Sequence, residues 1–418
     1  MLKRLKVEGF KSLQNVRLEF PPLTVLFGPN TAGKSNLLDA LVILSRTATQ
    51  RTLADAFSGE GVRGHPLEMF QFPQGGLSEL IEKEKARIAF EVDLETKARD
   101  KTSDRVRYKV AIDIDPRPAA LSIADEYLAP MTKNWTPRYT PVLELRGGQI
   151  HIRRKSKPAH PRIEPLGLNH TQLSDARFAG KEYFWIEKTR KQLSGFRTYY
   201  LDPRVSMRRS VPPREVEDIG TLGEDIAPFL YRLTDPKFIK HFQAIERTLK
   251  TIIPSVDSLS VDLDEKRGTL DLQITQNGTP YNCRIISEGT LRVLALCCVA
   301  ASPWPGELIA FEEPENGVHP RRLELVAQMI ADMAIDRARQ VIVTSHSPLF
   351  CEKILSMKRE YSKEISLIVV RQEKGKTYCR PFETSGELFK QKEIMAALSS
   401  PEEDGWFENL VLRGIVDA

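Results

Sequence analysis

The feature that most constrains the fold of this chain is a glycine-rich turn between an apolar run and a helical pattern. The turn, Gly28 to Ser35, reads GPNTAGKS and fits the pattern G-x-x-x-x-G-K-[S/T]. It follows the apolar run 23–27 and opens the periodic segment 34–46, so we expect a strand, a loop and a helix in that order. A chance match in an irregular loop is the alternative, and it would lack this context.

Each position of this turn has a chemical reason. Backbone N–H groups and a helix N-terminus favour bound phosphate, and Gly28 and Gly33 allow the tight path that brings them close. Lys34 would reach the β- and γ-phosphates, and the Ser35 hydroxyl would bind Mg²⁺. We therefore expect ATP and Mg²⁺ as ligands. The residues expected to hold the nucleotide from this turn are Gly28, Asn30, Ala32, Gly33, Lys34, Ser35 and Asn36.

Two carboxylates end a second apolar run much later in the chain, in the segment GELIAFEE at 306–313. Glu312 can hold Mg²⁺ through water, and Glu313 can polarise the water that attacks the phosphate. A surface pair that caps the turn at Pro314 is the alternative. The position of the pair after the phosphate-binding turn favours the catalytic interpretation.

A histidine follows a third apolar run, 341–344. A neutral imidazole at His346 can hydrogen-bond the γ-phosphate or the attacking water. A single histidine beside a strand is more often structural, but its position after the carboxylate pair favours catalysis.

A further anion site is indicated by the segment Ser287-Glu288-Gly289-Thr290, which opens the apolar helix expected at 291–301. Its hydroxyl, backbone N–H groups and helix dipole favour negative charge. The alternative is a plain helix cap with Ser287 as the capping residue. A second anion site is redundant within one subunit unless it faces the nucleotide of another subunit. This segment therefore motivates a homodimer.

The rest of the chain predicts several domains, since 418 residues exceed one ordinary domain. Alternating segments at 87–94 and 105–114 indicate antiparallel strands. Between 115 and 221 the pattern loosens and prolines cluster, which indicates an inserted lobe with a hairpin at 142–153 and a helix at 173–193. The predicted domains are 1–115, 116–221, 222–370 and a tail, 371–418.

Positive charge gathers in this inserted region, although the net charge of the whole chain is only +5. Such clusters can neutralise phosphates, so nucleic-acid contact is one interpretation, and a solvated loop is the other. The basic residues that we expect to touch nucleic acid are Arg153, Arg154, Lys155, Arg208 and Arg209.

The five cysteines form no C-x-x-C pair, so neither a disulfide framework nor a zinc site is implied. We find no stretch that is long and apolar enough to span a bilayer, and the first residues alternate like a strand rather than a signal peptide. These features predict a protein of the reducing cytoplasm that makes no membrane contact.

Together these segments resemble the ABC-type ATPase heads of the RecF, SMC and OLD type, over residues 1–115 and 220–370. The resemblance implies an α/β fold: a P-loop NTPase of the ABC-ATPase type, with an antiparallel β subdomain and an inserted α+β lobe. In that family, Gly28 to Ser35 would be Walker A, and Glu312 and Glu313 would end Walker B. Segment 9–12, Gly-Phe-Lys-Ser, is also typical of these heads.

The remaining family motifs can be placed in the same way. Segment 287–290 looks like the signature motif, 315–317 looks like the D-loop, and His346 looks like the switch histidine. The resemblance implies two heads that sandwich two ATP molecules, each bound by Walker A of one subunit and the signature motif of the other. Either Gln71 or Gln74 could be the Q-loop residue.

Departures from the family narrow the expectation. No sustained heptads tether the two halves, unlike SMC proteins, and the strand at 365–370 does not end in the Glu-Gly of a TOPRIM nuclease. We therefore expect an ATPase without its own nuclease, which dimerises around ATP and couples nucleotide state to DNA or an effector protein, in DNA repair or phage defence. The alternative is a nucleotide-gated scaffold that turns over slowly and holds a separate nuclease or toxin. A transporter subunit is disfavoured by the long basic insertion.

Overall fold

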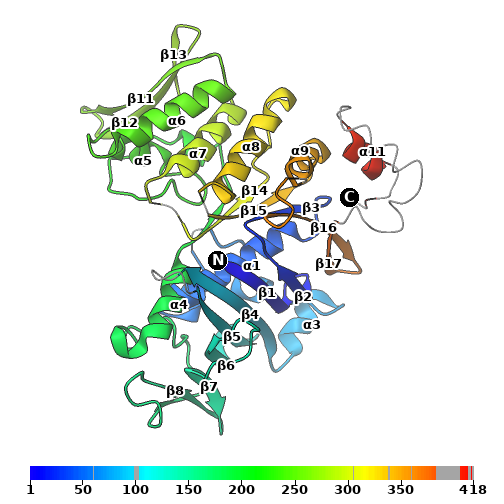
Figure 1. The fold of residues 1–418 in the computed structure, drawn as a ribbon. Helices are drawn as coiled ribbons and strands as arrows, with labels where there is room; N and C mark the ends of the chain where they lie inside the picture. Colours follow the sequence, from blue (N-terminus) through cyan, green and yellow to red (C-terminus); the bar gives the residue numbers. More distant parts are fainter. Residues whose placement is uncertain are drawn as a thin grey trace. The chain divides into compact units, whose positions relative to one another are not determined.

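The computed structural model describes residues 1–59, 61–97, 103–304, 306–337, 339–358, 360–382, 405–412 and 416. The chain forms two compact units (Figure 1). Unit 1 contains Met1–Pro21, Pro29–Phe196 and Val370–Arg380, and unit 2 contains Pro22–Gly28, Arg197–Val369 and Pro381–Ala418. Most of the predicted tail, 371–418, lies outside the described residues, and the predicted domain boundaries remain predictions.

Unit 1 is built on an antiparallel sheet with the order β2-β1-β4-β5-β6-β7-β8-β9 among its described residues. Its strands are β1 (Leu2–Phe10), β2 (Leu13–Glu19), β4 (Ala86–Lys97), β5 (Ser103–Asp115), β6 (Ala120–Met131), β7 (Leu143–Arg146), β8 (Gln149–Ile152) and β9 (Arg162–Pro165). The predicted hairpin at 142–153 is confirmed as β7 and β8, which turn at Gly147 and Gly148 with positive φ. Since β6 pairs with β5, the segment after residue 116 continues the sheet that precedes it.

The long strands of this sheet alternate between a buried apolar face and a charged face, as the sequence pattern predicts. On β4, Ile88 and Phe90 are buried, whereas Glu91 lies among cations of the neighbouring strands. Its Oε1 is 2.6 Å from Arg4 of β1, and its Oε2 is 2.9 Å from Lys109 of β5. Such cross-strand pairs help to fix the register of the sheet.

The helices of unit 1 are α1 (Lys34–Thr49), α2 (Leu53–Ala56), α3 (Gly76–Glu82) and α4 (Phe184–Ser194), with 3₁₀ turns at Pro66–Met69 and Lys181–Tyr183. Helix α1 confirms the helix expected after the glycine-rich turn. The helix expected over 173–193 is wrong in its first half. There the guanidinium of Arg190 donates to the carbonyl oxygens of Leu173, Asp175 and Phe178, so these carbonyls are satisfied without a helical ladder.

Unit 2 contains the parallel part of a second sheet, whose order is β10-β14-β15-β3-β16-β17. Its strands are β3 (Leu23–Phe27), β10 (Phe196–Tyr199), β14 (Leu308–Glu312), β15 (Gln340–Ser345), β16 (Ile365–Glu373) and β17 (Lys376–Pro381). Strand β16 enters unit 1 at Val370, and β17 belongs to unit 1 except for Pro381. Every residue of β3 and β15 is buried, which explains why apolar residues predominate in both strands. Because β3, β14 and β15 are parallel, their carboxyl ends meet at one edge, where ligands of α/β sheets commonly bind.

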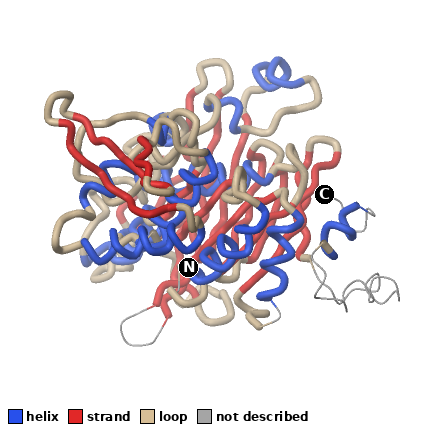
Figure 2. The backbone as a smooth tube through the Cα atoms, turned by 90° about the horizontal axis from the view of Figure 1, so that it is seen from above, coloured by secondary structure: helices blue, strands red, loops and turns tan. Residues whose placement is uncertain are grey.

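The helices of unit 2 are α5 (Ile226–Arg232), α6 (Ile239–Ile252), α7 (Glu288–Ala301), α8 (Leu323–Ala334), α9 (Pro348–Lys358) and α11 (Trp406–Leu412), with a 3₁₀ turn at Pro320–Arg322. A three-stranded sheet adds β11 (Val256–Asp264), β12 (Thr269–Gln276) and β13 (Thr279–Asn282). Helices α6, α7 and α8 lie side by side (Figure 1), and the nearly uniform burial of α7 accounts for its apolar sequence. Figure 2 shows the helices, strands and loops of both units along the backbone.

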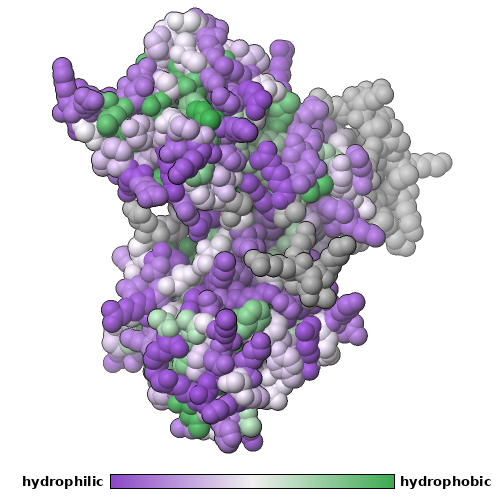
Figure 3. All heavy atoms as spheres, turned by 60° about the vertical axis from the view of Figure 1, so that its left-hand side comes forward, coloured by the Kyte–Doolittle hydropathy of each residue, from purple (hydrophilic) through white to green (hydrophobic). Residues whose placement is uncertain are grey.

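Hydrophilic residues dominate the face of the molecule seen in Figure 3, and apolar residues appear on it in small groups. Among the described residues, no helix is long and apolar enough to cross a membrane.

Candidate functional site

The predicted site residues fall in both compact units. Unit 1 holds Asn30 to Asn36, and unit 2 holds Gly28 together with the later motifs around Ser287, Glu312 and His346. The geometry within each unit follows.

In unit 1, the glycine-rich turn folds tightly over the start of α1. Gly33 caps this helix in the left-handed region, with φ +96°, and Thr31 also has a positive φ of +75°. The N–H of Ala32 donates to the carbonyl of Pro29 over 3.2 Å, and Nζ of Lys34 donates to the same carbonyl over 3.0 Å. The turn therefore presents its backbone and one buried cation at a helix N-terminus, the arrangement that binds phosphate.

A chain of hydrogen bonds supports this turn from below. The hydroxyl of Thr377 donates to the carbonyl of Ala32 over 3.1 Å, which uses its one proton. The 2.7 Å contact between Ser12 Oγ and Thr377 Oγ1 therefore has Ser12 as donor. Ser12 in turn accepts from Nδ2 of Asn36 over 2.7 Å. The order Asn36, Ser12, Thr377, Ala32 ties the turn to α1, to the segment after β1, and to β17.

This support leaves no room for a side chain at Gly33. A Cβ there would lie 2.1 Å from Thr377 Oγ1 and 2.9 Å from Ser12 Oγ, and the positive φ already disfavours other residues. Sequence reasoning found the segment that contains Ser12 but missed Thr377, because that residue lies outside every local motif.

Beside this support, Lys11 and Arg63 both pair with the buried Asp39 of α1. Nζ of Lys11 lies 2.7 Å from Oδ2, and Nη2 of Arg63 lies 2.9 Å from Oδ1. A cavity of about 620 Å³ in unit 1 is lined by Lys11, Ser12, Lys376 and both candidate Q-loop residues, Gln71 and Gln74. The structure thus places Gln71 and Gln74 in the same cavity lining as Ser12, which supports the turn. Either glutamine could still be the Q-loop residue.

In unit 2, the carboxylate pair lies at the edge where the parallel strands end. Glu312 is the last residue of β14 and pairs in register with Thr344. The next residue, Glu313, leaves the strand with φ +45°, a conformation that costs a residue other than glycine about 1–3 kcal/mol. Its N–H donates to the carbonyl and to the hydroxyl of Thr344, over 3.0 and 3.2 Å. These bonds hold the Glu313 backbone in its turned conformation.

Two side chains orient the carboxylate of Glu313. Nδ1 of His346 lies 3.1 Å from Oε1, and Nδ2 of Asn316 donates to Oε2 over 2.7 Å. The structure thus joins two residues that the sequence predicted as catalytic and adds Asn316 from the expected D-loop. A carboxylate held on both oxygens is oriented as a general base should be.

A third carboxylate, Glu315, lies buried beside this pair with 5% of its surface exposed. The hydroxyl of Ser345 donates to its Oε1, while its Oε2 is buried without a hydrogen-bond partner in the part of the chain that the structure describes. Burial raises the pKa of Glu315, and the negative charge of Glu313 raises it further, whereas the bond from Ser345 lowers it. Sequence reasoning noted Glu315 only as part of the D-loop.

The segment at the start of α7 has the geometry of a helix cap and also a close backbone contact. Oγ of Ser287 accepts from the N–H of Thr290 over 3.2 Å, and Oε1 of Glu288 lies 2.9 Å from Nε of Arg204. A Cβ on Gly289 would lie 2.0 Å from the carbonyl oxygen of Gly317. Only glycine therefore fits at position 289, and the expected signature motif and D-loop touch within unit 2.

Arg208, which the sequence predicts to touch nucleic acid, binds the loop that precedes α7, and its contact with nucleic acid stays a prediction. Its guanidinium donates to the carbonyls of Pro203 and Ile286 over 2.7 Å each, to Cys283 over 3.2 Å, and to Arg284. This arginine therefore holds the approach to Ser287. Its neighbour Arg209 is exposed.

The other basic residues expected to touch nucleic acid, at positions 153–155, lie in unit 1, whereas Arg208 and Arg209 lie in unit 2. Arg153 is engaged with the carbonyl of Pro141 over 2.7 Å and with Glu144 over 2.5 Å. Arg154 and Lys155 line a cavity in that unit.

The donor atoms expected for Mg²⁺ fit that ion chemically. Ser35 at the start of α1 offers a hydroxyl oxygen, and Glu312 at the end of β14 offers carboxylate oxygens. Mg²⁺ prefers such oxygen donors and keeps several of its waters.

Comparison with known proteins gives matches of three kinds. A family model described as "AAA domain, putative AbiEii toxin, Type IV TA system" matches residues 23–352. The DNA replication and repair protein RecF of Lactococcus lactis subsp. cremoris (strain MG1363) is 28% identical over 151 residues, which are 36% of this chain and 39% of that protein. The chromosome partition protein Smc of Methanocaldococcus jannaschii is 37% identical over 60 residues, 14% of this chain and 5% of that protein. The chain thus spans about two fifths of the length of this RecF protein.

Solved structures show the fold. An Smc head bound to the C-winged helix domain of ScpA aligns with a TM-score of 0.53 and 15% identity, covering 93% of this chain and 99% of that one. An Smc head from Pyrococcus furiosus aligns with a TM-score of 0.50 and 12% identity, covering 96% and 100%. These likenesses confirm the predicted fold class.

Proposed function

The chain belongs to the family described as "AAA domain, putative AbiEii toxin, Type IV TA system" and is an ABC-type ATPase head of the RecF and SMC class, and from this premise we propose that it hydrolyses ATP with Mg²⁺. The observation that carries the proposal is the geometry of Glu313, whose strained backbone and two oriented oxygens suit a general base.

Each residue of the site has a role in this reaction. The turn from Gly28 to Asn36 holds the phosphates, with Lys34 as the cation that binds the β- and γ-phosphates. Ser35 and Glu312 would hold Mg²⁺, which would supply positive charge to neutralise the phosphates. Glu313 takes up the proton of the attacking water, and His346 fixes the carboxylate of Glu313 while it contacts the γ-phosphate.

We further propose that two copies close around ATP, with Ser287, Glu288 and Gly289 of one copy facing the phosphates bound to the other. The support within one chain is the contact between Gly289 and Gly317, because Gly317 follows Glu315 and Asn316 of the carboxylate cluster. A change at Glu313 on hydrolysis would therefore reach the segment that faces the partner. In this way hydrolysis opens the dimer.

The dimer would couple its nucleotide state to DNA or to an effector protein in the cytoplasm, in DNA repair or phage defence. The relatives support both kinds of partner, since RecF is named for DNA replication and repair, and one Smc head is solved with a domain of ScpA. The second candidate is a nucleotide-gated scaffold with slow turnover that holds a nuclease or toxin. The family description, which names a putative toxin, favours keeping it.

Steady-state ATP hydrolysis by the full chain tests the proposal, with Glu313→Gln beside Glu307→Gln as a matched control. Glu307 is exposed and lies just before β14, so the same change there should leave hydrolysis unaltered. Glu313→Gln should keep ATP binding, lower the rate by about 10²–10⁴-fold, and favour the dimer. Lys34→Ala should abolish ATP binding. A normal rate in Glu313→Gln would place the base elsewhere.

The same assay separates the two candidate functions. Stimulation by single-stranded or duplex DNA, lost in Glu313→Gln, supports coupling to DNA. Slow hydrolysis that is indifferent to DNA supports the scaffold.

A further inference from the structure

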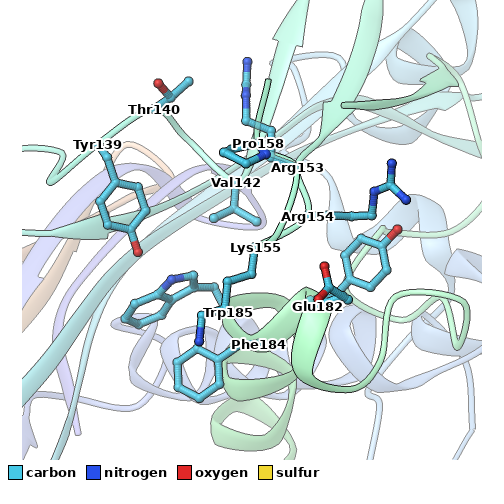
Figure 4. Close-up of a pocket in the computed structure, with 11 residues that line it drawn as sticks. Tyr139, Thr140, Val142, Arg153, Arg154, Lys155, Pro158, Glu182, Phe184 and Trp185 are labelled. Atoms are coloured by element: carbon cyan, nitrogen blue, oxygen red, sulfur yellow. The ribbon is translucent and has the colours of Figure 1, made fainter. Parts of the chain in front are cut away.

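Unit 1 contains a second cavity, of about 300 Å³, and no residue of the glycine-rich turn lines it. Its walls come from the segment after β6, the segment after β8, and the start of α4. The residues that shape it are Tyr139, Val142, Arg154, Lys155, Phe184 and Trp185. In Figure 4, Tyr139 and Trp185 lie on one side of the cavity, and Arg154 lies on the other.

The aromatic side of the cavity is exposed yet ordered by its own contacts. Phe184 and Tyr139 expose 43% and 49% of their surface, which is high for large apolar rings. The rings of Phe184 and Trp185 meet edge to face with centroids 5.1 Å apart. Exposed aromatic surface that is held in place suits a flat ligand.

The basic side of the cavity consists of Arg153, Arg154 and Lys155. Nε of Arg154 is buried without a hydrogen-bond partner in the described part of the chain. The neighbouring cation, Arg153, is already engaged by Glu144 and by the carbonyl of Pro141.

One carboxylate lies on the rim, and it too is engaged. Oε2 of Glu182 accepts from both the N–H and the hydroxyl of Ser156. These two bonds lower the pKa of Glu182, to which the charges of Arg154 and Lys155 also contribute. The rim therefore carries two cations around one carboxylate that is anchored to the chain.

We propose that this cavity binds one nucleotide of a single-stranded nucleic acid, with the base against Tyr139, Phe184 and Trp185 and the phosphate at Arg154 and Lys155. Stacking on aromatic side chains requires an unpaired base, which a single strand offers and a duplex does not. Arg154 can donate to phosphate oxygens from more than one nitrogen. The shared chemistry is a base that bears a phosphate, and we assign its source to a strand because the cavity is open and the neighbouring segment is basic.

This inference deepens the proposed coupling to DNA. The effect of a bound strand on the nucleotide state rests on that proposed function, whereas the binding of the strand does not. The cavity should bind a strand without ATP, since its residues belong to none of the motifs assigned to ATP.

The test is fluorescence anisotropy of a labelled oligothymidylate with the full chain, without ATP and at low salt. Trp185→Ala should weaken binding by about tenfold, within the range of one base stacked on one ring. Lys155→Ala should weaken it less and lower the slope of log affinity against log salt by about 0.7. The matched control is Trp135→Ala, which changes the same residue type outside the cavity lining and should bind like the unaltered chain.

Four outcomes overturn the inference. The first is no binding of the strand, and the second is equal affinity in Trp185→Ala and Trp135→Ala. The third is competition by thymidine monophosphate at concentrations as low as those of the strand, because the ligand would then be a free nucleotide. Preference for duplex would likewise contradict the stacked base.

ATP hydrolysis, measured without DNA on the same preparations, separates this inference from the proposed function. Trp185→Ala should hydrolyse ATP at the unaltered rate. If the chain binds the strand but hydrolyses no ATP, the cavity proposal stands and the proposed ATPase activity is wrong. If hydrolysis is normal and the two tryptophan variants bind the strand equally well, the cavity proposal is wrong and the proposed ATPase activity stands.

Discussion

Among the residues that the structure describes, Glu126 of unit 1 and Glu315 of unit 2 are buried carboxylates with raised pKa values, and the two differ in how their oxygens are satisfied. In unit 1, Oε2 of Glu126 accepts from the N–H of Gln172 over 2.7 Å, and Oε1 accepts from the hydroxyl of Tyr108 over 3.0 Å and from the N–H of Leu173 over 3.3 Å. In unit 2, Oε1 of Glu315 accepts from the hydroxyl of Ser345, and Oε2 has no partner among the described residues.

The difference shows how to separate a structural acid from a functional one. A buried polar group with all its bonds made fixes the packing around it, as Glu126 does between β6 and the segment at 171–173. A buried oxygen that is left unpartnered costs stability, so a native structure keeps it for another reason. Glu315 lies beside Glu313 in the proposed catalytic cluster, which supplies that reason.

The largest effect on stability is expected when Glu126, the carboxylate whose oxygens all have partners, is replaced. Glu126→Leu leaves the hydroxyl of Tyr108 and two N–H groups buried without an acceptor, at about 1–3 kcal/mol each. We expect the free energy of unfolding of unit 1 to fall by about 3 kcal/mol or more, measured by urea unfolding and by hydrogen exchange in β5 and β6. A loss under about 1 kcal/mol would show that Glu126 is not the structural acid described above.

The pH dependence of stability should report the same residue. Burial raises the pKa of Glu126 from 4.5 to about 7, against the hydrogen bonds from Gln172, Tyr108 and Leu173. Between these values the folded chain holds a proton that the unfolded chain has lost, so this contribution is complete below pH 4.5 and is lost as pH rises through 7. The full difference is about 3 kcal/mol.

We therefore expect the stability of unit 1 to fall between pH 5 and 7.5, relative to a Glu126→Gln variant, which cannot titrate. Urea unfolding at a series of pH values measures both slopes. Parallel slopes in the two proteins would contradict the raised pKa.

A smaller effect is expected at the unsatisfied carboxylate, and it should appear in activity. Glu315→Gln keeps the acceptor for Ser345 but removes the acid beside Glu313. We expect ATP hydrolysis to fall about tenfold, while the free energy of unfolding changes by less than about 1 kcal/mol. The reverse result, a stability loss with a normal rate, would make Glu315 as structural as Glu126 and would remove the comparison.

The smallest effect is expected for Ser345→Ala, which removes the hydroxyl that donates to Glu315 and accepts from the N–H of Ser347 over 3.0 Å. One hydrogen bond contributes about 1 kcal/mol, so we expect hydrolysis to fall about threefold to fivefold. Thr344, one residue earlier, binds the Glu313 backbone, and Thr344→Val should reduce hydrolysis through a different contact. If Ser345 acts through the carboxylate of Glu315, the double variant Ser345→Ala with Glu315→Gln should hydrolyse ATP no more slowly than Glu315→Gln alone.

Local patterns were enough to predict the elements that carry the site. The turn before α1, the strand that ends at Glu312 and the helix after Ser287 each have a signal within a few residues. The sequence could not reveal the contacts between distant segments. Thr377 supports the turn at Ala32 across 345 positions, and Arg208 reaches the loop before α7 across 75 to 78 positions. Similarly, the helix expected at 173–193 fails where Arg190 binds carbonyls of its first half.

The left-handed backbone at Glu313 has a consequence for how this site persists in evolution. Glycine adopts φ +45° without strain, so Glu313→Gly would relax the turn after β14 while removing the carboxylate that His346 and Asn316 orient. Selection for thermal robustness alone would favour the residue that destroys the chemistry. A glutamate retained in this conformation among relatives would therefore record selection on turnover, and its replacement by glycine would mark lineages that kept the fold after giving up hydrolysis.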